Sequence, residues 1–119
     1  MEFQFKKKHP DVEIRKNKCK ELMKKNDKQI PIILEKDSTF QYLDNYKSRY
    51  LINKDFTISQ FIYLVRTKFN IPEEQAIFLS AKGKYHLSGE RIMSDIYERF
   101  KDKEDGFLYI IMSKQEIYG

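Results

Sequence analysis

The stretch that decides the fold is DFTISQFIYLVRTKFN, residues 55–70. Thr57 followed three residues later by Gln60 fits a helix capping box, in which each side chain accepts a hydrogen bond from the backbone N–H of the other residue. Apolar side chains then recur every three or four residues, at Ile58, Phe61, Ile62, Val65 and Phe69. This spacing predicts a helix that begins at Thr57 and ends at Asn70, with one face in a protein core.

Two strand-like segments precede this helix. Residues 29–36 (QIPIILEK) alternate with the period of a strand, and residues 49–53 (RYLIN) form a second short run. Pro31 has no N–H to donate to a sheet ladder, so it belongs near an edge or at the start of its strand. The two segments are expected to pair as a hairpin with a long loop.

Further regular segments follow the helix. Residues 76–81 (AIFLSA) predict a strand, and a turn at 82–84 leads into a short partner strand. Residues 91–100 predict a helix that buries Ile92 among other apolar side chains. Residues 107–113 (FLYIIMS) carry an apolar run on both faces, which is typical of a strand buried in the middle of a sheet.

The first 28 residues predict two helices. Residues 2–8 form a short one that ends before Pro10, because the residue before a proline disfavours helical geometry. Residues 11–25 carry one narrow apolar stripe between lysines, and Cys19 is expected to pack there. The basic charge of this region indicates a solvated helix face, or a patch for anionic lipid, acidic peptides or nucleic acid.

The order of elements is therefore two helices, followed by strand, strand, helix, strand, strand, helix and strand. This order predicts the α+β class and the ubiquitin-like β-grasp fold, a four-stranded mixed sheet with helices packed on it. In that fold the last strand lies beside the first. We divide the chain into an N-terminal helical extension (residues 1–28), a β-grasp core (29–114) and a flexible C-terminal tail (115–119).

The composition excludes several functional classes. The chain has 119 residues, 34% charged and 40% apolar, which suits one folded domain. Its one cysteine and two histidines show no ligand spacing, so we expect no metal site and no Cys/His catalytic pair. Without a carboxylate pair or a phosphate-binding glycine loop, we expect neither enzymatic activity nor a cofactor. No apolar run approaches about 20 residues and the N-terminus is charged, so we expect no membrane span, no signal peptide and a cytosolic protein.

Six collinear segments resemble a known family. They are HP at 9–10, IPIILEK at 30–36, KSRYLI at 47–52, DFTISQFIYLVR at 55–66, IYERFKDKEDGFLYI at 96–110 and the closing YG. In order and spacing they resemble the autophagy ubiquitin-like modifiers of the GABARAP type. The resemblance spans nearly the whole chain.

The resemblance implies that Gly119 is the reactive end of the chain. An activating enzyme and a conjugating enzyme would carry its carboxyl group as a thioester and join it to the amine of phosphatidylethanolamine. A cysteine protease would be the processing or delipidating partner. The free protein is then expected to be a cytoplasmic monomer. The lipidated form is expected on autophagosomes or related vesicles, because two acyl chains hold a protein on a membrane stably.

The resemblance also implies docking of cargo receptors through aromatic-x-x-aliphatic motifs, which would add a strand to the edge strand at 49–53. By position in the family pattern, the aromatic-anchor pocket comprises Lys18, Leu22, Pro31, Ile33, Arg49, Leu51 and Phe107. The aliphatic-anchor pocket comprises Tyr50, Ile52, Phe56, Phe61, Leu64 and Arg66. Lys47 and Arg49 would favour acidic residues beside the motif. Plain core packing is the alternative role for the apolar members, and Leu64 is the most informative because it lies off the main stripe of its helix.

Three positions depart from the family pattern. Lys18 stands where an acidic residue is frequent, Gln29 where an arginine is usual, and Asn53 where a proline is usual. The pocket rim is therefore expected to be more basic, with an altered preference among peptides.

Two other functions are compatible with the sequence. A β-grasp scaffold would bind cytoskeletal or acidic partners through its basic N-terminal helices, without conjugation. The lysines and tyrosines also suit nucleic acid, but no RNA-binding motif accompanies them, so no nucleic-acid binding is expected.

Overall fold

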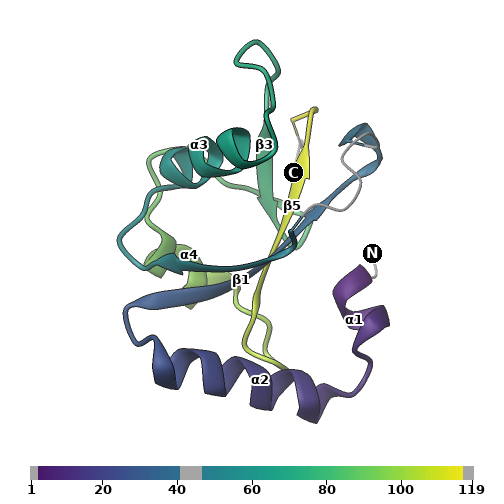
Figure 1. Cartoon of the computed structure of the whole chain (residues 1–119), viewed down its shortest axis with the longest axis vertical. Helices are drawn as coiled ribbons and strands as arrows, with labels where there is room; N and C mark the ends of the chain where they lie inside the picture. The colour runs from purple at the N-terminus through teal and green to yellow at the C-terminus, as the bar shows by residue number, and fades with distance from the viewer. Residues whose placement is uncertain (1–2, 41–46, 117–119) are drawn as a thin grey trace.

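The computed structural model describes residues 3–40 and 47–116 as one mixed sheet with helices packed on it (Figure 1). In chain order its elements are α1 (Gln4–Lys8), α2 (Val12–Lys25), β1 (Gln29–Lys36), the 3-10 turn η1 (Ser38–Phe40), β2 (Arg49–Asn53), α3 (Ile58–Lys68), β3 (Phe78–Ala81), β4 (Tyr85–His86), α4 (Met93–Phe100) and β5 (Leu108–Ser113). Each helix and strand predicted from the sequence is present, with ends close to those expected.

The strands lie in the order β2-β1-β5-β3-β4. β1 pairs antiparallel with β2 and parallel with β5, so the last strand lies beside the first, as predicted. The sheet has five strands and not four, because Tyr85 and His86 pair with β3. The turn before them uses left-handed backbone at Lys82 (φ 56°) and Gly83 (φ 72°), which closes a tight hairpin.

Alternate residues of the two central strands face opposite sides of the sheet. Ile32 on β1 and Ile110 on β5 belong to a larger core that they share with α3 and α4. Ile33 and Tyr109 belong to a second cluster, which they share with Phe5 of α1 and with α2. Because both faces are covered, every residue of β5 is buried, and this explains the apolar run in its sequence.

The capping box of α3 is present as predicted. Gln60 N–H donates to Thr57 Oγ1 at 3.2 Å, and Thr57 N–H donates to Gln60 Oε1 at 2.8 Å. The buried residues of the helix are Ile58, Phe61 and Val65. Asn70, just beyond the last turn, has left-handed backbone (φ 53°) that ends the helix.

The prediction that Ile92 is buried is wrong. Its side chain is 45% exposed, because α4 begins only at Met93. Ile92 lies at the N-cap position with extended backbone and forms an isolated β-bridge to Thr57. The residue therefore lies outside the apolar face of the helix.

Carboxylates attach α1 to the rest of the molecule. The Gln4 and Phe5 N–H groups donate to the two carboxylate oxygens of Glu35 on β1, at 2.9 and 2.8 Å. The Lys6 ammonium lies 2.6 Å from Asp102 Oδ2, in the loop between α4 and β5. Glu35 is buried, so α1 supplies hydrogen-bond donors to a carboxylate that would otherwise be costly to bury.

A buried ion pair attaches α2. Arg15 Nε donates to Asp105 Oδ2 at 2.8 Å, and the two side chains are 4% and 0% exposed. The Tyr109 hydroxyl donates to the same oxygen at 2.6 Å, and Phe107 N–H donates to Oδ1 at 2.9 Å. Burial and the neighbouring Asp105 carboxylate raise the pKa of the Tyr109 hydroxyl, which keeps it protonated as a donor. The helical stripe of α2 gave no sign that Arg15 is buried.

Candidate functional site

β2 lies at one end of the strand order, and its outer side carries no strand within the described part of the chain. Tyr50 and Ile52 are buried, whereas Arg49, Leu51 and Asn53 are exposed or half-buried. An edge strand of this kind presents backbone N–H and C=O groups with which an extended peptide can pair.

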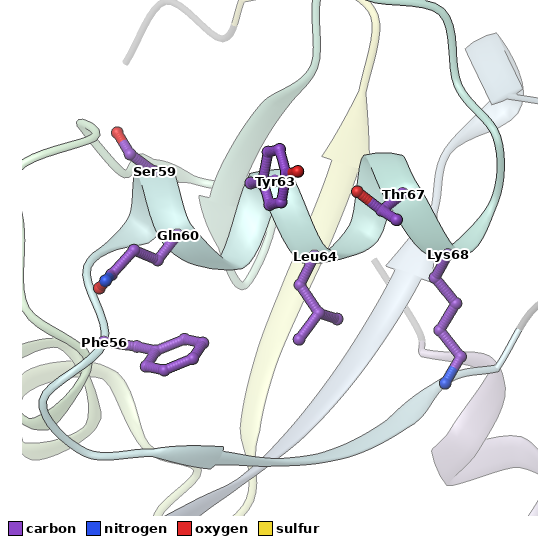
Figure 2. Close-up of a pocket in the computed structure, with 7 residues that line it drawn as sticks. All are labelled: Phe56, Ser59, Gln60, Tyr63, Leu64, Thr67 and Lys68. Atoms are coloured by element: carbon purple, nitrogen blue, oxygen red, sulfur yellow. The ribbon is translucent and has the colours of Figure 1, made fainter.

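An apolar hollow of about 690 Å³ lies between α3 and β2 (Figure 2). The side chains that line it are Phe56, Ser59, Gln60, Tyr63, Leu64, Thr67 and Lys68. Figure 2 shows Leu64 and Lys68 pointing from α3 toward β2, on the same side of the helix as Phe56. The hollow can therefore receive an apolar side chain from a ligand that lies along β2.

Five of the residues predicted for the aliphatic-anchor pocket lie at this hollow or in the core next to it. Phe56 and Leu64 line it and are half-buried. Tyr50, Ile52 and Phe61 are buried in the larger core, against which Phe56 and Leu64 pack. The Tyr50 and Phe61 rings meet edge to face at 5.6 Å. These three residues support the hollow from within the core.

Arg66, predicted for the same pocket, does not line the hollow. Its Nη1 donates to the carbonyl oxygens of Pro72 at 2.5 Å and Gln75 at 2.8 Å, which braces the loop after α3. The sequence prediction also missed Tyr63 and Lys68, which do line the hollow. Tyr63 is 72% exposed. A large aromatic residue off the apolar stripe of α3 was the available signal.

The residues predicted for the aromatic-anchor pocket lie around the second cluster. Ile33 and Phe107 are buried in it, and Leu22 packs against it. Pro31 is buried, Leu51 is half-buried, and these two are opposite each other in the β1-β2 ladder. Five of the seven predicted residues thus gather on β1, β2 and the neighbouring second cluster.

The other two, Lys18 and Arg49, are exposed and share a hollow of about 200 Å³. Phe5 and His9 also line it, together with Ile14 and Arg15. The N-terminal helices therefore form one wall of this hollow; Lys18 on α2 was predicted to lie there, whereas the contribution of α1 was not.

Three cationic side chains flank β2. The Lys47 and Lys68 ammonium groups lie 5.2 and 5.8 Å from the centroid of the Tyr50 ring, and Arg49 is exposed. None of the three forms an ion pair with a described residue. Their charges are therefore available to an acidic ligand.

Gly119, the predicted reactive end, lies outside the described residues, which end at Glu116. Within residues 3–40 and 47–116, no group of three or more His, Cys, Asp or Glu side chains could hold a metal ion. No helix in the same ranges has the length and hydropathy to cross a bilayer. Burial, with a contribution from the Asp105 carboxylate, raises the pKa of the Cys19 thiol to about 11, so this thiol is protonated at neutral pH.

Residues 14–119 match the family model described as autophagy protein Atg8, ubiquitin-like. The chain belongs to the Atg8 family. It is 38% identical to Autophagy-related protein 8 of Pichia angusta, over all of this chain and 93% of that protein. It is 37% identical to Autophagy-related protein 8e of Arabidopsis thaliana, over 92% of this chain and 88% of that protein. The crystal structure of Trypanosoma brucei ATG8 is similar over the full length of both chains, with a TM-score of 0.82 and 26% identity.

Atg8 membership confirms the resemblance found in the sequence and the ubiquitin-like β-grasp fold. The chain is therefore an autophagy protein of the ubiquitin-like class, a class of modifiers and not of enzymes. Two departures from the family pattern turn out to be neighbours, because Gln29 and Asn53 are cross-strand partners at the end of the β1-β2 ladder. The third, Lys18, adds a positive charge to the hollow that contains Arg49.

Proposed function

We propose that this Atg8 protein is joined through Gly119 to phosphatidylethanolamine, and that it recruits receptors carrying aromatic-x-x-aliphatic motifs to β2. Family membership supports the conjugation. The observation that carries the docking is that the two sets of anchor residues lie on opposite sides of the sheet, one with the larger core and one with the second cluster.

This arrangement suits the spacing of the motif. Successive side chains of a strand point to opposite faces, so two residues three positions apart also point to opposite faces. A peptide that pairs with β2 would place its aliphatic residue in the hollow beside Leu64. Its aromatic residue would lie on the other side, near Leu51 and Lys18. Each buried anchor contributes about 1.5–3 kcal/mol, so two anchors supply about 3–6 of the roughly 8 kcal/mol that a micromolar affinity requires. Main-chain hydrogen bonds to β2 would have to supply the rest and offset the ordering costs.

The charges around β2 add selectivity. Lys47, Arg49 and Lys68 would attract acidic residues beside the motif, and Lys18 strengthens the field on the aromatic side. Contacts between exposed charges are screened by salt, with a Debye length of about 8 Å at physiological ionic strength. Binding of acidic peptides is therefore expected to weaken as salt is added.

The proposed partners are the activating and conjugating enzymes, a cysteine protease that processes or delipidates the protein, and motif-bearing cargo receptors. The free form would be a cytoplasmic monomer. Lipidation supplies two acyl chains, which is enough for stable attachment to an autophagosomal membrane. Exposed lysines such as Lys7 and Lys8 on α1 would add about 1 kcal/mol each close to anionic lipid.

Conjugation is tested by incubating the full chain with both enzymes, ATP and liposomes that contain phosphatidylethanolamine. We expect a lipid-linked product that floats with the liposomes, and none from Gly119→Ala. Absence of this product from the wild type would overturn the proposed conjugation.

Docking is tested with a labelled acidic peptide that carries the motif. Leu64→Asp removes an anchor contact and places a charge in the hollow, so affinity should fall about tenfold to a hundredfold. Ile92→Asp is the matched control, because Ile92 is an exposed aliphatic residue that does not line the hollow. A second peptide with one extra residue between its anchors puts both on one face and should bind weakly. Equal binding by wild type and Leu64→Asp would refute the docking site.

A further inference from the structure

A side chain ties the C-terminal end of β5 to η1. The ladder of β5 ends with Ser113, which pairs with Phe78 of β3. One residue later, Lys114 N–H donates to Thr39 Oγ1 at 2.8 Å, although the two residues are 75 positions apart. Figure 1 shows η1 directly after the end of β1. Because β1 and β5 are parallel, β5 ends at the same end of the sheet. The Thr39 hydroxyl thus accepts the hydrogen bond of the first backbone amide beyond the strand.

Thr39 is itself held by Asp37. The Thr39 hydroxyl donates to Asp37 Oδ1, and the Thr39 N–H donates to the same oxygen at 2.9 Å. Asp37 N–H donates to the carbonyl oxygen of Met112 at 3.0 Å, which carries the contact between β1 and β5 one residue beyond β1. A hydroxyl has one proton and two lone pairs, so it can donate to Asp37 and accept from Lys114 together. We call Asp37, Thr39 and Lys114 the tail clamp.

The residues of the tail clamp and their neighbours make further contacts. Phe40 is fully buried in the larger core, and the Lys114 ammonium lies 5.5 Å from the centroid of its ring. Gln115 N–H donates to Ser113 Oγ at 3.0 Å, and Ser113 is buried. Contacts to η1 and β5 therefore hold the chain at Lys114 and Gln115, where it leaves the sheet.

We propose that Thr39 is a positioning residue for the activation of Gly119, and that the tail clamp presents the chain to the activating enzyme by holding Lys114, where the chain leaves the sheet. The inference rests on the proposed conjugation. In activation a Gly119 carboxylate oxygen attacks the α-phosphorus of ATP, which forms an acyl adenylate and releases pyrophosphate. The enzyme's cysteine thiol then displaces AMP and loses its proton as the thioester forms. Thr39 takes part in neither bond change. It raises the fraction of free molecules in which the tail clamp already holds Lys114, and this fraction enters the apparent affinity directly.

Two substitutions separate the hydroxyl from the shape of the side chain. Thr39→Val keeps the branched shape without the hydroxyl, and Thr39→Ser keeps the hydroxyl. Thr39 is only half-buried, so neither change opens the core. Loss of one hydrogen bond corresponds to about a twofold to tenfold change in an equilibrium constant. We expect Thr39→Val to raise the KM of the activating enzyme for this protein by up to that factor with kcat unchanged, and Thr39→Ser to restore the wild-type KM.

The assay is ATP–pyrophosphate exchange with the full chain, with Gly119→Ala as the blank. Hydrogen exchange at the Lys114 amide reports the clamp, and motif-peptide binding gives the concentration of folded protein for each variant. A wild-type KM in Thr39→Val overturns the inference alone, and so does unchanged exchange at Lys114. Equal KM increases in both variants also overturn it, because shape and not the hydroxyl would then matter. Absence of ATP–pyrophosphate exchange with the wild-type protein overturns the proposed conjugation and this inference together.

Discussion

Asp105→Asn is expected to be the most destabilising single change at the attachment of α2. The substitution keeps the size of the side chain and removes its charge, which leaves the buried Arg15 guanidinium without its carboxylate. Asp105 also accepts hydrogen bonds from the Tyr109 hydroxyl and the Phe107 N–H, so three donors depend on it. Breaking one side of a buried ion pair costs about 3–5 kcal/mol. That is a large fraction of the roughly 5–15 kcal/mol that stabilises a typical domain.

The assay is urea unfolding followed by circular dichroism. With a slope of roughly 1–3 kcal/mol per molar urea, the midpoint should fall by about 2 M. The double variant Arg15→Met, Asp105→Asn removes the unpaired cation and should recover at least half of the loss, because methionine can occupy the same apolar space. A loss below about 1 kcal/mol in Asp105→Asn would refute the reasoning. A double variant less stable than the single one would do so too.

Three contacts near the N-terminal helices give further expected outcomes. Partial burial acts to raise the pKa of Asp102, but hydrogen bonds from the Lys6 ammonium and from loop amides bring it below its ordinary value of 3.8. The pair therefore stabilises the fold above that pH, and the stabilisation is lost as the pH falls through the lowered pKa. An NMR titration should show this midpoint, and Lys6→Met should raise it. Cys19 is 2% exposed and the pKa of its thiol is raised. Iodoacetamide at pH 8 should therefore alkylate it only when urea unfolds the protein. Rapid alkylation of the folded protein would contradict this prediction. Gly106 has φ +85°, and an added Cβ would lie 3.1 Å from Cys19 Sγ. Gly106→Ala should therefore lower the free energy of unfolding by about 1–3 kcal/mol in urea titrations. An unchanged urea midpoint would contradict the expected strain.

Local patterns predicted the elements of this fold because the interactions that make them are local. Thr57 and Gln60 are three residues apart, so the capping box of α3 could be identified in the sequence. The apolar run of β5 reflects helices on both faces of the sheet, and it placed this strand in the middle. By contrast, Arg15 and Asp105 are 90 residues apart. No spacing rule connects two charges across that distance, and only the packing of α2 on the sheet brings them together.

The same distinction between local and long-range interactions applies to the residues of the candidate site. The residues on β2 and Leu64 followed from alignment to a family pattern and from the position of Leu64 off the apolar stripe of its helix. The contacts of Arg66 could not be predicted, because they depend on the path of the loop after α3. Its guanidinium donates to the carbonyl groups of Pro72 and Gln75 in that loop. The contact of Thr39 with Lys114 was not predicted, because a threonine in a polar connection between elements has no distinguishing sequence pattern. Its partner, the Lys114 amide, becomes adjacent only when β1 and β5 pair in parallel.

Part of the basic charge of the N-terminal helices stabilises the fold. Lys6 and Arg15 pair inside the molecule with Asp102 and Asp105. Deleting residues 1–28 would remove these partners and uncover the second cluster, which includes Phe107. Loss of binding after such a deletion would therefore report a damaged fold and not a lost binding surface. A deletion cannot separate the modifier from the alternative scaffold that binds partners through basic helices.

Substitution of the exposed lysines does separate the two. Lys7 and Lys8 are exposed and form no ion pair with a described residue. Changing both to Gln removes surface charge and leaves both internal ion pairs in place. A basic scaffold would lose its partners in this variant and would be indifferent to Gly119→Ala. We expect the opposite, because the proposed docking residues lie on β2 and α3 and the proposed reactive group is the C-terminal carboxylate. Motif-peptide binding by the double Gln variant should stay within about fivefold of the wild type, since exposed charges of this kind contribute at most about 1 kcal/mol. A larger loss would favour the scaffold.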